Sequence, residues 1–306
     1  MKIISAVDGS PHSRAAGSLL SRIPFPQDTE IVAVNVLEDV YKSVYGEQLG
    51  NLVQETLHDD RQEQARTLLE AESAQLSRNF TTVRTEQITG HAARDITRLA
   101  SKENADLIAL GARGMNALER FLLGSTSEEI VRHAPCSVLV ARDSSHASNK
   151  PANDRSRLRF LVTCDGSPAT STSIETLCQL PLNESVEVLL LSVHSLVTSF
   201  RADILQRMSA EWHREEALAR KALDEAVERL SAAGVRHVTA RVEEADDVAA
   251  EILKTANTWT ADIIMAGSTG KGAVDRFLLG SVSRRLIRHA PGSVWIVRQK
   301  PGTATS

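Results

Sequence analysis

Short apolar runs alternate with longer amphipathic stretches along residues 1–142, and this alternation predicts the order of strands and helices. Apolar runs of about four to eight residues are too short for helices and are typical of buried strands. They lie at residues 2–7, 30–36, 81–88, 107–110 and 137–141. Helical spacing and polar helix starts predict helices at 11–22, about 52–76, after Gly90 and at 125–133. The predicted order is therefore β-α-β-α-β-α-β-α-β.

This order indicates an α/β fold with a parallel sheet. Parallel neighbours need a connection as long as a helix, so a helix between successive strands favours this arrangement. Aromatic residues make up 4% of the chain, so its cores must consist mainly of Val, Ile, Leu and Ala. These residues are typical of parallel strands covered on both faces.

The pattern begins again after residue 157, so the chain contains two copies of one unit. Asp8-Gly9-Ser10-Pro11 returns 157 residues later as Asp165-Gly166-Ser167-Pro168, and Asp106–Arg142 returns at Asp262–Arg298. The strands predicted in the second copy lie at residues 159–164, 186–193, 235–242, 262–266 and 294–297. Residues 143–157, DSSHASNKPANDRSR, have the polar composition of a linker. We therefore predict domains at 1–142 and 158–299.

Composition and charge exclude several classes of protein. A formal net charge of −4 gives no basic surface of the kind that binds nucleic acid. Three cysteines without CxxC spacing predict neither a disulfide framework nor a zinc site, and they fit a reducing compartment. The opening MKIISAVDGS has no signal-peptide pattern, and no apolar run reaches the roughly 18 residues of a membrane span. We expect a cytoplasmic protein without a membrane partner.

The end of the fourth predicted strand carries a glycine pattern suited to an anionic ligand. Gly111 and Gly114 follow that strand, and Gly124-Ser125-Thr126 then begins a helix. Ligands of doubly wound sheets bind beyond the carboxyl ends of the strands, and a helix start offers unpaired N–H donors. We therefore predict a phosphate-binding turn, repeated in the second copy at Gly267, Gly270, Gly280 and Ser281. Neither turn matches the Walker phosphate loop or GxGxxG.

The pattern G-x2-G-x9-G-[ST], with an Asp ending the first strand of an α/β unit, resembles the ATP-binding universal stress protein domain. The resemblance covers both halves, as in tandem members of that family, and implies two flavodoxin-like, Rossmann-like doubly wound domains with five-stranded parallel sheets. Two positions differ between the copies. Gly90 has Ala245 opposite it, and Cys164 stands where the first copy has Val7.

The resemblance also implies a set of nucleotide-binding residues for ATP, with or without Mg²⁺, and no metal ligand among the side chains. Asp8 would lie at the adenine–ribose end, and Val36 would offer backbone contacts to adenine. Ribose and phosphates would be held by Gly111, Ala112, Arg113, Gly114, Gly124, Ser125, Thr126 and Ser127. The second copy supplies Asp165, Val193, Gly267, Ser268, Gly270, Lys271, Gly280, Ser281, Val282 and Ser283.

The charges at the two helix starts differ. Ser125-x-x-Glu128 reads as a capping box and is followed by Glu129, whereas the second helix begins Ser281-x-x-Arg284-Arg285. Lys271 follows Gly270, whereas Met115 follows Gly114, with Arg113 compensating in part. Our hypothesis is that the second site holds a triphosphate more tightly.

For several of these residues, a purely structural role is an alternative to a role in binding or catalysis. Gly111 and Gly267 are also explained as strand-end turn glycines, and Asp8 and Asp165 as caps of the following helices. His133 and His289 are better explained as helix C-terminal residues than as catalysts. Arg120 and Arg276 fit either a phosphate contact or a solvent-facing or inter-domain role. Packing under the long helix suits Tyr41, Tyr45 and Trp212 better than covering a nucleotide.

The last strand of each copy is a candidate sheet edge, which leaves open pairing within one chain, as a pseudo-dimer, or between chains, as a homodimer. Trp295 in the second of these strands is either an interface anchor or a core residue.

Together these features predict a protein that binds ATP in a stress response, so that ATP occupancy biases its conformation or its choice of an unidentified protein partner. No general base, Walker lysine or kinase-type constellation stands beside the glycine turns. We therefore expect binding rather than turnover. The alternatives are a slow ATPase or autophosphorylating protein, and a nucleotide-free scaffold, whose degraded glycines this chain lacks.

Overall fold

A computed structural model describes residues 1–38, 59–114, 123–142, 157–195, 202–270 and 279–299, with side chains in the long helix of the second half from residue 214. These residues form two compact units. Unit 1 contains the described residues up to 142, and unit 2 contains those from 157 to 299.

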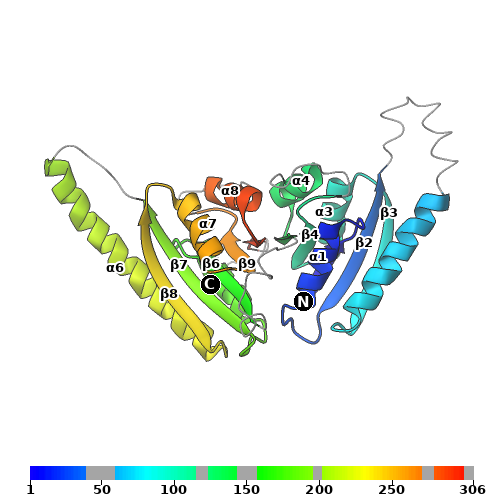
Figure 1. Cartoon of the computed structure of the whole chain (residues 1–306), viewed down its shortest axis with the longest axis horizontal. Helices are drawn as coiled ribbons and strands as arrows, with labels where there is room; N and C mark the ends of the chain where they lie inside the picture. Colours follow the sequence, from blue (N-terminus) through cyan, green and yellow to red (C-terminus); the bar gives the residue numbers. More distant parts are fainter. Residues whose placement is uncertain (39–58, 115–122, 143–156, 196–201, 271–278, 300–306) are drawn as a thin grey trace, which may run out of the picture. The chain divides into compact units, whose positions relative to one another are not determined.

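Unit 1 is a parallel sheet in the order β3-β2-β1-β4-β5 with helices between its strands (Figure 1). Right-handed crossovers place α1 and the helix of residues 59–76 on one face and α3 and α4 on the other. The elements are β1 (Lys2–Ala6), α1 (Pro11–Leu20), β2 (Glu30–Glu38), the helix over residues 59–76, β3 (Thr82–Gly90), α3 (Ala92–Lys102), β4 (Leu107–Gly111), α4 (Ser125–His133) and β5 (Ser137–Ala141).

Unit 2 repeats this topology, with the strand order β8-β7-β6-β9-β10 and parallel pairing (Figure 1). The expected α/β fold with five-stranded parallel sheets is confirmed in both units. The elements are β6 (Leu158–Thr163), α5 (Pro168–Cys178), β7 (Val186–Ser195), α6 (Ala202–Ala232), β8 (His237–Ala245), α7 (Val248–Thr258), β9 (Ile263–Gly267), α8 (Ser281–His289) and β10 (Ser293–Val297).

Strands β2 and β3 both end two residues later than the apolar runs predict, at Glu38 and Gly90. Their register pairs Leu37 with Thr89 and Glu38 with Gly90, so each strand extends the other through the backbone ladder. Hydrophobic runs alone do not show this extension, because its residues are partly polar. Strand β7 is longer for the same reason and pairs with β8 up to Ser195.

The strand order reverses between β1 and β4 in unit 1 and between β6 and β9 in unit 2. The chain leaves β1 toward β2 and β3 on one side, and it later reaches β4 and β5 on the other. Connections that depart in opposite directions leave a crevice at the carboxyl ends of these strands, which is where doubly wound folds bind ligands.

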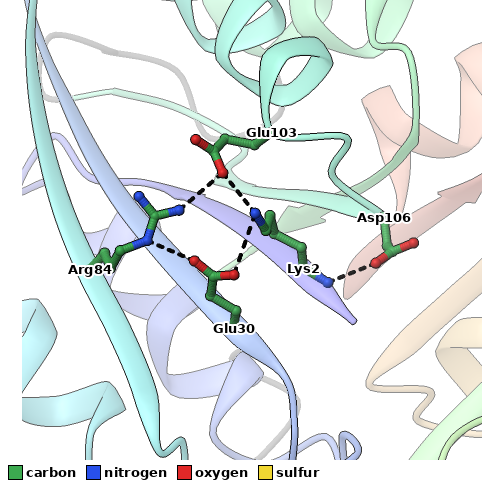
Figure 2. A network of polar contacts seen from close by, with 5 residues as sticks. All are labelled: Lys2, Glu30, Arg84, Glu103 and Asp106. Atoms are coloured by element: carbon green, nitrogen blue, oxygen red, sulfur yellow. Dashed lines mark hydrogen bonds and ion pairs between the residues drawn. The ribbon is translucent and has the colours of Figure 1, made fainter.

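A network of ion pairs holds together the amino ends of the strands in unit 1, at the end of the sheet opposite that crevice (Figure 2). Lys2 Nζ lies 3.3 Å from Glu30 Oε2 and 2.7 Å from Glu103 Oε2, and Arg84 contacts the same two carboxylates. The backbone N–H of Lys2 donates to Asp106 Oδ2 at 2.6 Å. The hydrogen bond from Arg84 lowers the pKa of Glu30, and that from Lys2 lowers the pKa of Glu103.

In unit 2 a single residue, Arg159, takes over most of these contacts. Its Nε lies 3.0 Å from Glu187 Oε2, and its backbone N–H donates to Asp262 Oδ2 at 2.8 Å. Its guanidinium also donates to Thr260 Oγ1 and stacks over the ring of Trp259 at 5.5 Å. The two units therefore close the same end of the sheet with different side chains.

Candidate functional site

The turn after β1 is held by the carboxylate of Asp8. Asp8 Oδ1 accepts a hydrogen bond from the backbone N–H of Ser10 at 2.9 Å, and Gly9 between them has φ +77°. Ser10 Oγ in turn accepts from the backbone N–H of Ser13 and caps α1. The alternative that Asp8 itself is the helix cap is therefore wrong. Unit 2 is arranged in the same way, with Ser167 as the cap of α5.

Gly111, at the end of β4, is required by the fold itself. A Cβ at this position would lie 2.7 Å from the backbone of His12 and Ser13, because the first turn of α1 packs directly against the strand end. At Gly267 the corresponding Cβ would lie 2.4 Å from Ala169 Cβ. The structural explanation is thus sufficient for these two glycines, whether or not they also contact a ligand.

The second glycine of the motif faces the carboxylate at the end of the first strand. A Cβ at Gly114 would lie 2.9 Å from Asp8 Oδ2, and one at Gly270 would lie 2.9 Å from Asp165 Oδ2. In unit 1 the hydroxyl of Ser10 also donates to the carbonyl of Arg113 at 3.1 Å, which ties the two turns together. The structure therefore brings together the two parts of the motif.

Helix α4 begins at Ser125, and Gly124 is its N-cap, with an extended backbone at φ −66° and ψ 151°. Within the part of the chain that the structure describes, no side chain caps this helix or α8, whose N-cap is Gly280. The predicted capping box is wrong, because Ser125 already lies inside the helix and the carboxylate of Glu128 pairs with Arg132. Both helix starts thus present backbone N–H donors without a side-chain cap.

The hydroxyls of Ser127 and Ser283 are used within the fold. Ser127 Oγ donates to the carbonyl of Gly111 at 2.8 Å, and Ser283 Oγ donates to that of Gly267 at 2.7 Å. Both side chains are buried. These bonds anchor the first turn of each helix to the preceding strand end, so a ligand would meet the backbone N–H groups here rather than the hydroxyls.

A cavity of about 440 Å³ lies at the carboxyl ends of the strands in unit 1. Ala112 and Gly124 do not line it; instead, the Gly124 N–H donates to the carbonyl of buried Ala112 at 2.9 Å and closes the turn. The residues expected from the sequence that do line the cavity are Asp8, Val36, Gly111, Arg113, Gly114, Ser125, Thr126 and Ser127.

The corresponding cavity in unit 2 measures about 190 Å³. Ser268 is buried and does not line it, and its carbonyl accepts from the N–H of Gly280. Lys271 lies outside the described residues. The remaining expected residues line the cavity, namely Asp165, Val193, Gly267, Gly270, Gly280, Ser281, Val282 and Ser283.

Apart from Val36, the wall on the side of β2 and α3 is missing from the sequence prediction. In unit 1 the Arg61 guanidinium donates to the carbonyl of Glu38 at 2.9 Å, and Glu38 Oε1 accepts from the N–H of Ala92. These three residues and Ile96 line the cavity, as Val248 and Ile252 do in unit 2. The recurrence of isoleucine at positions 96 and 252 is a sequence signal for this wall, whereas nothing in the pattern around Arg61 singles it out.

The difference between Gly90 and Ala245 has a local cause. A Cβ at Gly90 would lie 2.2 Å from Asp95 Oδ2. Asp95 is buried and pairs with Arg94 and Arg98, and the hydrogen bond from Arg94 lowers its pKa. In unit 2 the third helix is capped by Asp247 and carries Glu251, which pairs with Lys254 instead. The Cβ of Ala245 is therefore tolerated.

The charges near the two helix starts are partly compensated. Arg285 forms an ion pair with Asp247, and Arg284 Nη2 donates to the carbonyl of Leu279 at 3.3 Å. In unit 1, burial and, to a smaller extent, the positive charge of Arg113 together lower the pKa of Arg142 to about 10. The two guanidiniums therefore lie near one another, and Arg113 lines the cavity.

Of the other residues singled out from the sequence, Cys164 lines a cavity, and the rest lie away from the cavities or outside the described residues. His133 and His289 are the last, exposed residues of α4 and α8. Trp295 is fully buried in β10. Cys164 lines the second cavity, and burial raises the pKa of its thiol to about 12. The positions of Tyr41, Tyr45, Arg120 and Arg276, and the side chain of Trp212, lie outside the described residues.

Two further properties concern the described residues as a whole. None of the helices traced in the structure is both long and apolar enough to cross a membrane. Among the described side chains, no group of three or more His, Cys, Asp or Glu residues is arranged to hold a metal ion.

Comparison with known proteins places this geometry in a family. The model of the Universal stress protein family matches residues 1–142 and 157–298. A universal stress protein of Mycolicibacterium smegmatis is 32% identical over 223 residues, which cover 72% of this chain and 70% of that protein. A putative universal stress protein of Staphylococcus aureus is 33% identical over 148 residues, covering 46% of this chain and 82% of the relative.

A solved structure has the same fold over nearly the whole chain. The crystal structure of a universal stress protein from Archaeoglobus fulgidus covers 98% of this chain and 96% of its own, with a TM-score of 0.61 and 20% sequence identity. At this identity the likeness shows the fold alone.

Proposed function

The chain belongs to the universal stress protein family, and from the geometry of its two glycine turns we propose that each unit binds one ATP molecule. The nucleotide would lie at the carboxyl ends of β1 and β4 in unit 1, and of β6 and β9 in unit 2. ATP occupancy would then bias the conformation of the protein or its choice of a protein partner, in the cytoplasm, without catalytic turnover.

The observation that carries this proposal is that Gly124 and Gly280 are not needed by the fold. Gly124 has an ordinary φ of −66°, and a Cβ there would make only normal contacts, 3.5 Å from the carbonyl oxygen of Ala112 and the Cα of Arg113. The same holds for Gly280, at 3.5 Å from the carbonyl oxygen of Ser268. A side chain at either position would instead lie against the backbone of the glycine turn, at Arg113 and Gly114 in unit 1 and at Thr269 and Gly270 in unit 2. A ligand that approaches the backbone closely explains both glycines.

The residues present fit the parts of ATP. The uncapped starts of α4 and α8 supply N–H donors and the positive end of the helix dipole, which suit phosphates. Asp8 also lines the cavity; its Oδ1 accepts from the N–H of Ser10, while its Oδ2 faces Gly114. Val36 lines the cavity as well, and the family resemblance assigns it contacts to adenine.

We propose binding without turnover because few charged side chains line the first cavity and both of its carboxylates already accept hydrogen bonds from the backbone. Apart from Asp8, Glu38, Arg61 and Arg113, the described lining of the first cavity consists of uncharged side chains and glycines. Of the two carboxylates, Asp8 accepts from Ser10 and Glu38 accepts from Ala92. Each is thus engaged in positioning a neighbouring turn or helix start.

ATP titration of variants that close one turn at a time tests the proposal. Gly124→Asp and Gly280→Asp each place a carboxylate at a helix N-cap, a position that suits Asp, while the added charge repels phosphate. We expect each single variant to lose one of two sites and the double variant to lose both. Equal binding by wild type and double variant would refute the proposal, and ADP that accumulates only with intact turns would favour the slow ATPase.

A further inference from the structure

The helix of residues 59–76 carries a carboxyl group into the interior of unit 1. The side chain of Glu72 is 5% exposed, and its Oε1 has no hydrogen-bond partner among the described residues. It packs against the backbone of α1 at Gly17, where an added Cβ would lie 2.1 Å from Oε1. The carboxyl group therefore occupies the space that any side chain at position 17 would fill.

The contact between Glu72 and Gly17 is one of several that join residues 68–79 to residues 9–21, and we call this set of contacts the seam. Leu68 packs against Gly9, and Gln75 Nε2 donates to Ser18 Oγ at 3.4 Å. One turn further on, Asn79 Nδ2 donates to the carbonyl of Ser21 at 3.3 Å. Glu72 lies between these contacts, so its state of charge acts on the seam as a whole.

Among the residues that the structure describes, no charged group faces Glu72 closely enough to compensate its charge. On α1, Arg14 donates to the carbonyl of Gly9 and His12 lies one turn or more before Gly17. On its own helix, Arg66 pairs with Glu63 and Glu70 on the exposed side. Leu69 packs on Val7 and Ala33, and by strand register this sheet face carries Ser5, Val7, Ala33, Asn35, Val83, Thr85 and Gln87, all uncharged.

Burial alone raises the pKa of Glu72 to about 6 from its ordinary value of 4.5. A carboxyl group with a raised pKa in the folded state favours folding when it is protonated. Its contribution is therefore complete below pH 4.5 and is lost as the pH rises through 6. The helix should be held most tightly in acid.

Unit 2 fills the same seam with apolar side chains. Counting from the first residues of α1 and α5, Ile174 takes the place of Gly17, and counting from Leu69 and Leu223, Ala226 takes the place of Glu72. Both are buried, at 2% and 7% exposed. The exchange of Gly and Glu for Ile and Ala keeps the seam filled but removes its ionisable group.

We propose that Glu72, packed on Gly17, is an acid-sensitive latch that fastens the helix of residues 59–76 to α1 and thereby strengthens the ligand site of unit 1 alone. The helix of residues 59–76 supports the ligand site of unit 1 through contacts at two places. Leu68 contacts Gly9 beside Asp8, and Arg61 lines the cavity and donates to Glu38. The effect on the ligand rests on the proposed function, whereas the latch itself does not.

Hydrogen exchange on the full chain without ligand tests the latch. After correction for the intrinsic exchange rate, we expect opening of the helix over residues 59–76 to increase about 8-fold from pH 5 to pH 7.5, from the folded and unfolded pKa values of Glu72. Glu72→Gln should remove this dependence. Glu70→Gln, on the exposed side of the same helix, should retain it, and α6 should not show it.

The double variant Gly17→Ile with Glu72→Ala carries the residue types that unit 2 has at Ile174 and Ala226. It should make hydrogen exchange of the helix over residues 59–76 independent of pH while keeping the helix packed. Equal pH dependence in wild type and Glu72→Gln would overturn the latch, as would an equal response of α6. If Glu72→Gln fails to fold, the double variant decides the question by the same comparison.

ATP titration of the Gly280→Asp chain, which keeps only the first site, tests the coupling to the ligand. The quantity to compare is the ratio of the ATP affinity at pH 5.5 to the ATP affinity at pH 7.5. This ratio should be several-fold larger in the chain with Glu72 than in the chain with Gln at position 72. Equal ratios would overturn the coupling. A chain that binds no ATP at either pH would instead refute the proposed function, and the exchange experiment would still decide the latch.

Discussion

Asp8 Oδ2 lies against the Cα of Gly114, so closely that an added Cβ would stand 2.9 Å away, and Asp165 lies against Gly270 at the same distance. The two residues of each pair are about a hundred positions apart and come from the ends of neighbouring strands. Repetition of this contact in both units shows that the strand-end carboxylate and the second glycine of the motif form one structural element.

Gly114→Ala should therefore weaken nucleotide binding in unit 1. The new methyl group displaces the Asp8 carboxylate, and an exposed carboxylate can turn aside without unfolding the unit. We expect a loss of about 1.5–3 kcal/mol in binding, the usual range for a hydrogen bond to a charged group, with little change in thermal stability. Calorimetric titration with ATP measures it, and Gly270→Ala is the matched variant for unit 2. Wild-type affinity in both variants would contradict the assignment.

Gly111→Ala should instead destabilise the fold. Its Cβ would meet backbone atoms of His12 and Ser13 at 2.7 Å, and backbone cannot move aside as a side chain can. We expect about 1–3 kcal/mol lower stability of unit 1, measured by native-state hydrogen exchange of β4 amides. Gly124→Ala is the control, because its Cβ makes only ordinary contacts and should change stability much less. An equal loss of stability in Gly111→Ala and Gly124→Ala would show that the fold does not require Gly111 more than Gly124.

The ion pairs at the amino ends of the strands predict a loss of stability in acid. Contacts with Lys2 and Arg84 lower the pKa of Glu103 in the folded unit. The resulting stabilisation is present above the ordinary pKa of 4.5 and is lost as the pH falls through the lower folded value. Because the carboxylate of Glu103 remains 15% exposed, the network should contribute only about 0.5–1 kcal/mol.

Glu103→Gln should remove that acid dependence. Hydrogen exchange of β1 amides between pH 5 and pH 3 measures it, and Glu128→Gln, which changes a carboxylate outside the network, is the control. A wild-type pH profile in Glu103→Gln would show that the network does not stabilise the sheet. The direction is opposite to that expected for Glu72, whose window lies between pH 4.5 and 6, so the two effects are separable.

The ion pair between Arg285 and Asp247 predicts a way to strengthen the second site. Asp247→Asn retains an N-cap of similar quality for α7 while it removes the charge that compensates Arg285. We expect ATP affinity in unit 2 to rise by about 0.3–1 kcal/mol at low salt and the gain to shrink at high salt. Titration of the Gly124→Asp chain isolates this site. An unchanged or lower affinity would mean that Arg285 does not act on the phosphates.

The sequence predicted most of the fold because its signals are local. Alternating apolar runs and amphipathic stretches predict the strands and helices, and duplication of each element supports the reading in both halves. The prediction also placed Asp8 and Gly114 at neighbouring strand ends, since a doubly wound order brings the first and fourth strands together.

The sequence could not predict features that depend on backbone geometry or on distant contacts. Ser125-x-x-Glu128 has the spacing of a capping box, yet Gly124 is the N-cap, because the turn from β4 delivers the chain in extended form one residue earlier. Glu72 reads as one more charge on a solvated helix. Its burial follows only from the absence of a side chain at Gly17, on another helix.

We propose that each chain carries two nucleotide sites built on the turns at Gly124 and Gly280. The most direct measurement is the amount of nucleotide bound per chain when ATP is present in excess, released by denaturation and identified by chromatography. We expect two adenine nucleotides for the wild type, one for Gly124→Trp or Gly280→Trp, and none for the double variant. The same stoichiometry in wild type and double variant, or no bound nucleotide in the wild type, would contradict it.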